Sequence, residues 1–315
     1  MPIEPPVDSP RSLDEAYRII ASSGSDGPIR PLAGATDLLV QITGELGPPP
    51  ARLLDLWRLD ELRGIQVDRG ALVLGALTTY TEIRRSALCR EIAPALVDAA
   101  ATIGAAQIQN RGTLGGNIAN ASPAGDTLPV LLAMDAKIVV GSARGEREVA
   151  AAAFWPAYRR TALAPDELVL RVRLPIVPGR EVRFRKVGTR RAQAISKVVL
   201  ALAWRDEPDE TEVGPRVWRD VRLGLGSVAP TPIRAPATER LLEGSRPTPE
   251  TADRAAETLA GEIQPIDDVR STADYRKAVT ARVFHRLIRE AGGWRARRSR
   301  GWRCTAPRFP GSIAS

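Results

Sequence analysis

Two glycine-rich segments are the parts of this sequence best suited to bind a ligand. They read Ala33-Gly34-Ala35-Thr36-Asp37-Leu38 and Thr113-Leu114-Gly115-Gly116-Asn117. A pyrophosphate needs several converging backbone N–H donors, and only residues with little or no side chain let the backbone approach it closely. Each hydrogen bond to a charged group contributes roughly 1.5 to 3 kcal/mol, so four or five would hold a dinucleotide without a lysine. Either segment alone could be a tight turn, but the pair favours a dinucleotide site.

Other kinds of catalytic or metal chemistry lack the residues that they need. Neither glycine segment is followed by the Gly-Lys-Ser/Thr of a P-loop, and neither has the spacing of a nicotinamide Rossmann fingerprint. The two cysteines, Cys89 and Cys304, are far apart and form no CxxC pair, and His285 is the only histidine. The chain therefore offers no ligand set for a metal ion or an iron–sulfur cluster. It also shows no carboxylate pair, Ser-His-Asp set or nucleophilic cysteine.

Length and composition are those of a globular protein with about two domains. The chain has 315 residues, of which 43% are hydrophobic and 26% charged, and this argues against a disordered, fibrous or membrane-spanning protein. No run approaches the 18 or so consecutive apolar residues of a spanning helix, and residues 1–10 carry prolines and acids where a signal peptide needs a basic and then an apolar stretch. We therefore expect a cytoplasmic protein without a membrane span.

The net charge of +8 raises the alternative of a basic, non-enzymatic nucleic-acid-binding protein. The last twenty residues, however, hold five arginines and no acid. Much of the excess therefore lies in a tail, residues 294–315, which we expect to be disordered. This distribution favours a protein without a nucleic-acid partner.

The first glycine segment lies between a predicted strand and a predicted helix. A capping box at Ser12 and Glu15 opens the first helix of the chain. A strand over 29–32, the glycine turn, and a helix with Thr36 as its N-cap then follow. A strand, a glycine turn and a helix N-terminus together form the geometry of an anion site. Residues 52–56 predict a further strand, and 65–75 a hairpin.

The second glycine segment lies between apolar elements. A capping box at Thr79 and Glu82 predicts one helix, and helical spacing from about Glu91 to Gly104 predicts a longer one. Residues 111–129 are rich in glycine and small polar residues, which favours a buried functional loop. Strands over 137–140 and 167–174 come next. The second strand should place four apolar side chains on one face: Leu168, Leu170, Val172 and Leu174.

A change of composition near Pro178-Gly179 predicts a second domain. Three strands, 184–187, 194–204 and 217–225, suggest an antiparallel sheet. Three helices follow, over about 236–242, 249–263 and 273–291. Strands followed by helices indicate an α+β fold.

The long run from Gln107 to Asp126 reads Gln-Ile-Gln-Asn-Arg-Gly-Thr-Leu-Gly-Gly-Asn-Ile-Ala-Asn-Ala-Ser-Pro-Ala-Gly-Asp. With residues 33–38, and with Asp166-Glu167-Leu168 before Leu174-Pro175, it resembles the FAD-binding medium subunit of molybdenum hydroxylases, the xanthine dehydrogenase and carbon monoxide dehydrogenase group. The C-terminal domain of that family is similar to three further segments here: Phe184-Arg185-Lys186-Val187-Gly188, the run from Leu223 to Pro232, and Ala273-Asp274-Tyr275-Arg276.

The resemblance implies an α+β protein in two domains. Residues 1–178 would form a vanillyl-alcohol-oxidase (PCMH) type FAD-binding domain with subdomains of about 1–57 and 58–178. Residues 179–293 would form a small α+β domain with a three-stranded antiparallel sheet and helices, like the C-terminal domain of the carbon monoxide dehydrogenase flavoprotein.

The resemblance also implies which residues bind the cofactor, FAD held without a covalent bond. Leu32 to Leu38 would be the first phosphate loop, comprising Leu32, Ala33, Gly34, Ala35, Thr36, Asp37 and Leu38. Thr113 to Asn117 would be the second, comprising Thr113, Leu114, Gly115, Gly116 and Asn117. Ile103 would face the flavin ring, Asp126 would make a polar contact to FAD, Val169 would pack on it, and Lys186 would reach the ring edge.

Most of these residues also have a purely structural interpretation. Asp126 could cap a helix that begins at Thr127, and Asn117 could be a turn residue. Lys186 lies among basic neighbours and could belong to a solvated face. His285 is more typical of a helix surface than of a site. Tyr275 and Arg276 are interpreted as packing or interface residues.

The sequence departs from the family pattern in three places. Ala35 stands where many relatives have a second glycine, and Leu114 replaces a common isoleucine. In the loop from Gly188 to Ala192, relatives often carry an aromatic residue near the flavin, and this chain has Thr189, Arg190 and Arg191.

The function implied by the family is that of an electron-transfer subunit without catalytic residues of its own for substrate oxidation. FAD would accept electrons from iron–sulfur clusters on a partner chain and pass them to an external acceptor. The partners would be a small iron–sulfur subunit and a large molybdopterin subunit, assembled as a dimer of heterotrimers. A self-contained flavin oxidase is the other enzymatic alternative, but it would need its own acid–base residues.

Overall fold

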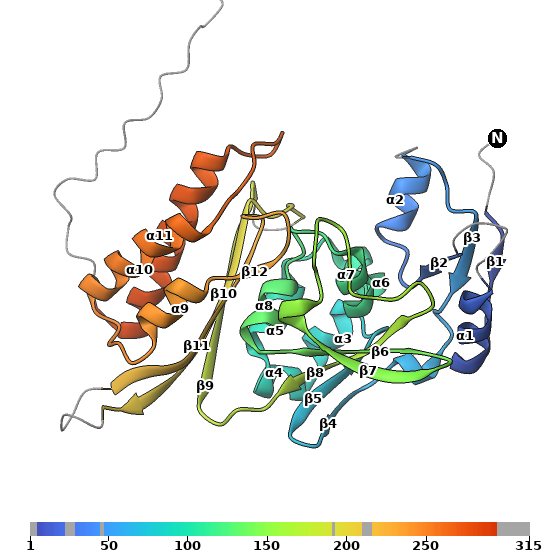
Figure 1. Ribbon diagram of the computed structural model, residues 1–315, viewed down its shortest axis with the longest axis horizontal. Coiled ribbons are helices and arrows are strands. Elements are labelled where there is room, and N and C mark those ends of the chain that lie inside the picture. Colours follow the sequence, from blue (N-terminus) through green and yellow to red (C-terminus); the bar gives the residue numbers. More distant parts are fainter. Residues whose placement is uncertain (1–4, 23–28, 45–46, 191–192, 210–215, 295–315) are drawn as a thin grey trace, which may run out of the picture.

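The computed structural model describes residues 5–22, 29–44, 47–190, 193–209 and 216–294. The basic tail from residue 295 onward lies outside the described residues, so its expected disorder stays a prediction. Trp294, the first residue of the expected tail, is described and donates its indole N–H to the Pro247 carbonyl at 2.7 Å. The chain forms an elongated molecule, with an N-terminal lobe at one end, a central lobe, and a sheet covered by helices at the other end (Figure 1). Three buried apolar clusters support these parts, and the central cluster extends into the C-terminal sheet through Phe184, Val199, Ala201 and Ala203.

The N-terminal lobe is a small parallel sheet with two helices. Its strands, in the order β1-β3-β2, are Val7–Asp8, Arg52–Asp55 and Ile29–Leu32. Helix α1 (Leu13–Ala21) begins as predicted, because the Ser12 Oγ accepts a hydrogen bond from the Glu15 N–H at 3.2 Å. The box is not reciprocal, since the Glu15 carboxylate accepts from the Arg11 N–H at 2.7 Å instead.

Helix α2 (Leu38–Thr43) begins later than its predicted cap at Thr36. Asp37 occupies the N-cap position, and its side chain makes no capping hydrogen bond. The reason is local: Asp37 already has helical dihedral angles, with φ −93° and ψ −41°, whereas a capping residue needs an extended backbone. The prediction of a Thr36 cap was therefore wrong. No side chain accepts a hydrogen bond from the N–H groups at the start of α2.

The central lobe is a five-stranded antiparallel sheet in the order β4-β5-β8-β6-β7. The strands are Ile65–Asp68, Ala71–Gly75, Leu168–Pro175, Lys137–Ser142 and Gly145–Ala150, in that order across the sheet. The helices of this lobe are α3 (Tyr80–Arg85), α4 (Ala87–Ile92), α5 (Pro94–Ala101), α6 (Ala106–Arg111), α7 (Leu114–Asn120) and α8 (Leu128–Ala133). Of these, α5 and α8 lie between the central sheet and the C-terminal sheet (Figure 1).

Two helix predictions for this lobe were wrong and one was confirmed. The capping box of Thr79 and Glu82 is present and opens α3. The expected single helix over 91–104 is divided into α4 and α5 at Pro94, because a proline disfavours the helical conformation in the residue before it. The expected loop over 111–129 contains α7, whose N-cap Thr113 accepts a hydrogen bond from the Gly116 N–H at 3.1 Å.

Strand β8 also differs from its expected alternation. Val139 of β6 pairs with Arg171 and Val140 with Val169, so β8 has one extra residue between them. This bulge reverses the faces of the strand on either side of it. Leu168 and Leu170 therefore pack in the N-terminal cluster, whereas Val169 joins Val172 and Leu174 in the central cluster. The four residues predicted to share one face do not.

The C-terminal domain contains a four-stranded antiparallel sheet, not the three-stranded sheet that we expected. Its strands, in the order β12-β11-β10-β9, are Ile233–Arg234, Arg216–Gly226, Val198–Pro208 and Arg180–Val187. The fourth strand, β12, has two residues, which is too short to show an alternating pattern. Helices α9 (Pro236–Leu242), α10 (Pro249–Glu262) and α11 (Ala273–Gly292) cover the outer face of the sheet (Figure 1).

The inner face of this sheet packs against α8 of the central lobe. The approach is close, because a Cβ atom at Gly224 would lie 2.1 Å from the carbonyl oxygen of Pro129. Beside this contact, Asp135 forms ion pairs with three arginines of the C-terminal domain. Its carboxylate oxygens lie 3.0 Å from Arg222 Nε, 2.9 Å from Arg234 Nη1 and 3.7 Å from Arg180 Nη2.

Replacing Asp135 with asparagine should weaken this junction. Asparagine tolerates the left-handed backbone at this position (φ 51°) and keeps the side-chain shape, but it removes the charge that faces the three guanidinium groups. Hydrogen bonds to charged groups contribute roughly 1.5 to 3 kcal/mol, so we expect the free energy of unfolding to fall by about 2 kcal/mol. Chemical denaturation measures this, with Asp98→Asn on the exposed side of α5 as the charge control. Equal stability of the two variants would contradict the role of Asp135.

Candidate cofactor site

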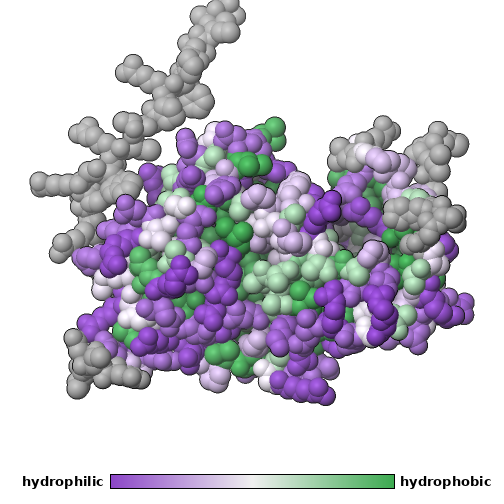
Figure 2. All heavy atoms as spheres, viewed as in Figure 1, coloured by the Kyte–Doolittle hydropathy of each residue, from purple (hydrophilic) through white to green (hydrophobic). Residues whose placement is uncertain are grey.

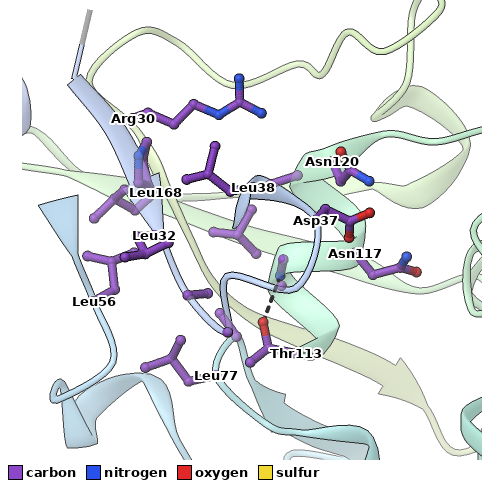
Figure 3. Close-up of a pocket in the computed structure, with 18 of the residues that line it drawn as sticks. Arg30, Leu32, Asp37, Leu38, Leu56, Leu77, Thr113, Asn117, Asn120 and Leu168 are labelled. Atoms are coloured by element: carbon purple, nitrogen blue, oxygen red, sulfur yellow. Dashed lines mark hydrogen bonds between the residues drawn. The ribbon is translucent and has the colours of Figure 1, made fainter. Parts of the chain in front are cut away.

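A cavity of about 550 Å³ lies between the N-terminal and central lobes. This volume is within the range of about 300 to 1,000 Å³ that is usual for small-molecule sites. The surface is indented between α2 and the rest of the molecule (Figure 2). Both glycine segments line the cavity, the first from the turn between β2 and α2 and the second from the start of α7 (Figure 3).

The first segment presents a row of backbone donors that the protein does not use. Among the described residues, the N–H groups of positions 34 to 38 have no acceptor, and the first N–H to be bonded is that of Leu39, which donates to the Ala35 carbonyl at 2.9 Å. Ala35 has a left-handed backbone (φ 65°) and Asp37 a right-handed one. Unbonded N–H groups in a tight turn are a backbone arrangement that suits anion binding.

The second segment is different, because four of its five backbone donors already have partners, and only the Thr113 N–H has no described acceptor. Leu114 donates to the Thr78 carbonyl, Gly115 to the Ala76 carbonyl, Gly116 to the Thr113 hydroxyl, and Asn117 to the Thr113 carbonyl, over 2.8 to 3.1 Å. The segment therefore offers surface and side chains to a ligand, whereas the first segment offers the amide hydrogens. The sequence suggested two equivalent loops, and the hydrogen bonds show that they are not equivalent.

The glycines have two separate roles in this site. A Cβ atom at Gly34 would lie 1.8 Å from the Arg111 carbonyl oxygen, and one at Gly115 would lie 2.7 Å from the Ala76 carbonyl oxygen. These two glycines therefore allow protein segments to meet. Gly116 is different. A Cβ atom there would lie 2.8 Å from the Thr113 hydroxyl of its own segment, and its next neighbour would be the Ala33 Cβ of the other segment at 3.9 Å. Only at Gly116 does the missing side chain leave room between the two segments.

Arg111 joins the two lobes beneath the cavity, and the sequence analysis did not single it out. Its carbonyl contacts Gly34, and its guanidinium carbon lies 3.7 Å from the centre of the Trp57 ring. Arg63 lies on the same ring at 4.6 Å and donates to the Trp57 carbonyl. Such cation–π contacts hold planar groups face to face. The available signal was the position of Arg111 inside the glycine-rich run, two residues before Thr113.

A second group of predicted site residues lies where the central lobe meets the C-terminal domain. The Lys186 ammonium is 2.5 Å from the Asp126 carboxylate and donates to the Thr102 carbonyl at 3.1 Å. The two side chains are only 8% and 7% exposed. Ser196 also donates to Asp126. Burial raises the pKa of the Asp126 carboxyl above its usual range, and the neighbouring Lys186 ammonium opposes this shift.

These contacts exclude several of the simpler interpretations. Lys186 is not on a solvated face, and Asp126 does not cap the next helix, α8, whose N-cap Thr127 makes no capping bond. Asn117 lies within α7 and is not a turn residue. Its side-chain oxygen accepts from the Thr127 hydroxyl at 2.6 Å. Because Thr127 follows Asp126 directly, Asn117 links the cavity to the Asp126–Lys186 pair.

The structure therefore divides the predicted site residues into two neighbouring groups. Ile103, Asp126 and Lys186 form the group at the domain junction, since Lys186 binds the carbonyl beside Ile103. Leu114 is fully buried in the central apolar cluster and lines no cavity. The other twelve line the cavity: Leu32, Ala33, Gly34, Ala35, Thr36, Asp37, Leu38, Thr113, Gly115, Gly116, Asn117 and Val169.

The remaining residues of the sequence analysis lie away from the cavity. Arg276 is a packing residue, because it is buried and donates to the Lys197 and Ser227 carbonyls and to Asp268. Tyr275 beside it is 44% exposed. His285 pairs with Asp253 on the helix surface, as expected. In the part of the chain that the structure describes, no cluster of metal-binding side chains occurs, and no helix is long and apolar enough to cross a membrane.

Two family models match the chain in succession. Residues 6–177 match the FAD binding domain in molybdopterin dehydrogenase, and residues 183–291 match the CO dehydrogenase flavoprotein C-terminal domain. The first match covers more than half of the sequence. The chain therefore belongs to the family of FAD-binding domains of molybdopterin dehydrogenases, and it is an FAD-binding oxidoreductase subunit.

Individual relatives are similar along nearly their whole length. The medium chain of glyceraldehyde dehydrogenase from Sulfolobus acidocaldarius is 32% identical over 279 residues, which are 89% of this chain and 95% of that one. The xanthine dehydrogenase FAD-binding subunit of Escherichia coli O157:H7 is 29% identical over 290 residues, 90% and 95% of the two chains. A structure of carbon monoxide dehydrogenase from Hydrogenophaga pseudoflava has a TM-score of 0.84 at 29% identity, and covers 91% of this chain and 96% of its own.

Because the glycines have different roles, a substitution at Gly116 is the most direct test of whether FAD occupies the cavity. Gly116→Val should fill the space between the two segments and weaken FAD binding at least tenfold, and its cost to the fold should be limited to displacing the Thr113 hydroxyl that caps α7. Gly115→Val is the matched control, because its side chain meets Ala76 and should lower the free energy of unfolding by about 1 to 3 kcal/mol through overpacking. Fluorescence titration with FAD and thermal unfolding separate the two effects. Native FAD affinity in folded Gly116→Val would show that FAD does not pass between the segments.

Replacing Asp126 with asparagine should destabilise the protein strongly. The change leaves the buried Lys186 ammonium without its counter-ion, and breaking a buried ion pair costs about 3 to 5 kcal/mol. Adding Lys186→Met should recover part of this loss, because the unpaired charge is then gone. Denaturant unfolding of both variants measures the difference. If the double variant is no more stable than the single one, the ion pair does not account for the loss.

Proposed function

We propose that FAD binds without a covalent link along a path from the cavity to the domain junction, and that the protein is the electron-transfer subunit of a molybdenum hydroxylase complex. The observation that carries this proposal is the row of unused N–H groups at positions 34 to 38, which faces a cavity of suitable size. A helix N-terminus and convergent amides favour a bound phosphate.

The residues fit a dinucleotide in two parts. The loop from Leu32 to Leu38 would hold the diphosphate through its free amides, and Thr113, Gly116 and Asn117 would form the opposite wall. Val169 would pack on the cofactor, because it lines the cavity at the edge of the central apolar cluster. Ile103, Asp126 and Lys186, at the other end of the Asn117–Thr127 hydrogen bond, would contact the flavin ring.

Bound FAD supplies redox chemistry that exchanges electrons in single or paired steps. The residues of this chain bind it, orient it and exclude water from part of it. Among the described residues, none forms a metal site where substrate could be oxidised. We therefore assign substrate oxidation to a large molybdopterin subunit and electron relay to a small iron–sulfur subunit, in a cytoplasmic dimer of heterotrimers.

The domain division is part of the same proposal. The FAD-binding domain would comprise residues 1–178, and the C-terminal domain residues 179–293. The two family models meet between 177 and 183, and β8 ends at Pro175 while β9 begins at Arg180. Both boundaries support a division at this turn.

Purification of the protein from its native host tests the function. We expect yellow protein that co-purifies with molybdenum- and iron-containing chains and releases its colour on acid precipitation. The isolated chain should show a flavin that dithionite reduces and a dye acceptor reoxidises, but no turnover of a panel of aldehydes, heterocycles and carbon monoxide. Turnover by the metal-free chain would favour a self-contained oxidase instead. A colourless protein with salt-sensitive nucleic-acid affinity would overturn the flavoprotein assignment.

A further inference from the structure

Two arginines line the cavity from different lobes, and neither belongs to a glycine segment. Arg30 lies on β2 and Arg159 on the segment before β8. Arg30 extends along one side of the cavity and Asn120 lies on the other side (Figure 3). Arg159 donates to the Asn120 side chain at 3.2 Å, so its guanidinium is at that second side. The two guanidinium groups therefore reach the cavity from different lobes.

Both guanidinium groups keep hydrogen-bonding capacity. Among the described residues, nothing pairs with the Arg30 side chain. Arg159 uses Nη1 on Asn120 and reaches the Tyr158 hydroxyl through Nε at 3.4 Å, which leaves Nη2 without a described partner. Its backbone is left-handed (φ 51°), an unfavourable conformation for an arginine.

The carboxylates of the cavity do not neutralise these arginines. Glu167 is held by Arg147 through both of its oxygens, and those hydrogen bonds lower the pKa of the Glu167 carboxyl. Asp37 is the other carboxylate among the residues that line the cavity, and it forms no described ion pair. Two cations therefore face one unpaired anion, which leaves a net positive charge and favours an anionic ligand.

We propose that Arg30 and Arg159 form a clamp that binds the diphosphate of the dinucleotide from the two lobes, together with the amides of positions 34 to 38. This inference rests on the proposed function, and it adds the residues that distinguish a diphosphate ligand from an uncharged flavin. Guanidinium groups suit this role because their paired N–H donors match phosphate oxygens. Because both side chains are exposed at the cavity, their attraction should be screened by salt.

The experiment compares Arg30→Gln, Arg159→Gln and the double variant with wild type. Arg282→Gln on α11 is the matched control, because Arg282 is also exposed, has no described partner and lines no cavity. FAD, ADP and riboflavin are titrated into each apoprotein at low and high salt, and thermal unfolding without ligand checks the fold. ADP reports the diphosphate alone, and riboflavin reports the ring system alone.

We expect each single variant to bind FAD and ADP about tenfold more weakly, and the double variant about a hundredfold more weakly. Riboflavin affinity should not change, and the salt dependence of ADP binding should be smaller in the double variant. Equal losses for riboflavin, or equal effects of Arg282→Gln, would overturn the clamp. Wild-type protein that binds neither FAD nor ADP would overturn the proposed function as well, whereas native FAD binding in all variants would overturn the clamp alone.

Discussion

The site depends on one close approach, that of the Gly34 backbone to the carbonyl oxygen of Arg111. A Cβ atom at this position would overlap the oxygen, so only glycine allows the N-terminal lobe to meet the central lobe there. The contact places the unused amides of the first segment beside the start of α7. The Arg111 side chain also joins these two lobes, because its guanidinium group stacks on the Trp57 ring. The cavity is thus made by the meeting of two lobes and belongs to neither alone.

The second junction has a different physical character. Helix α8 packs against the C-terminal sheet through buried apolar residues, with the Pro129 carbonyl close to Gly224, and ion pairs lie on both sides of this contact. Asp135 meets three arginines, and Asp126 meets Lys186 in a buried pair. Buried ion pairs contribute little net stability, yet they penalise any arrangement that separates their members. The junction is therefore suited to fix the orientation of the C-terminal domain beside the cofactor path.

The hydrogen bonds also show that the two glycine segments have different functions, which their similar composition did not suggest. Four N–H groups of the second segment, those of residues 114 to 117, donate to Thr78, Ala76 and Thr113, and these hydrogen bonds anchor α7 beside the central sheet. The first segment anchors no helix in this way. Because no side chain caps the start of α2, the N–H groups of positions 34 to 38 stay available to a ligand. Anion binding and structural anchoring are thus separated, although both segments contain glycine for close backbone approach.

The sequence by itself determined the local features of this protein. The Thr79–Glu82 capping box, the two glycine segments and the run from Gln107 to Asp126 were readable because each depends on residues close together in the chain. Only the tertiary structure decided that Val169 faces the central core, since a bulge set by pairing with β6 reverses the strand. It likewise decided the pairing of Lys186 with Asp126, 60 residues apart, and the addition of the two-residue β12 to the sheet. These features depend on long-range packing and register, for which local periodicity carries no signal.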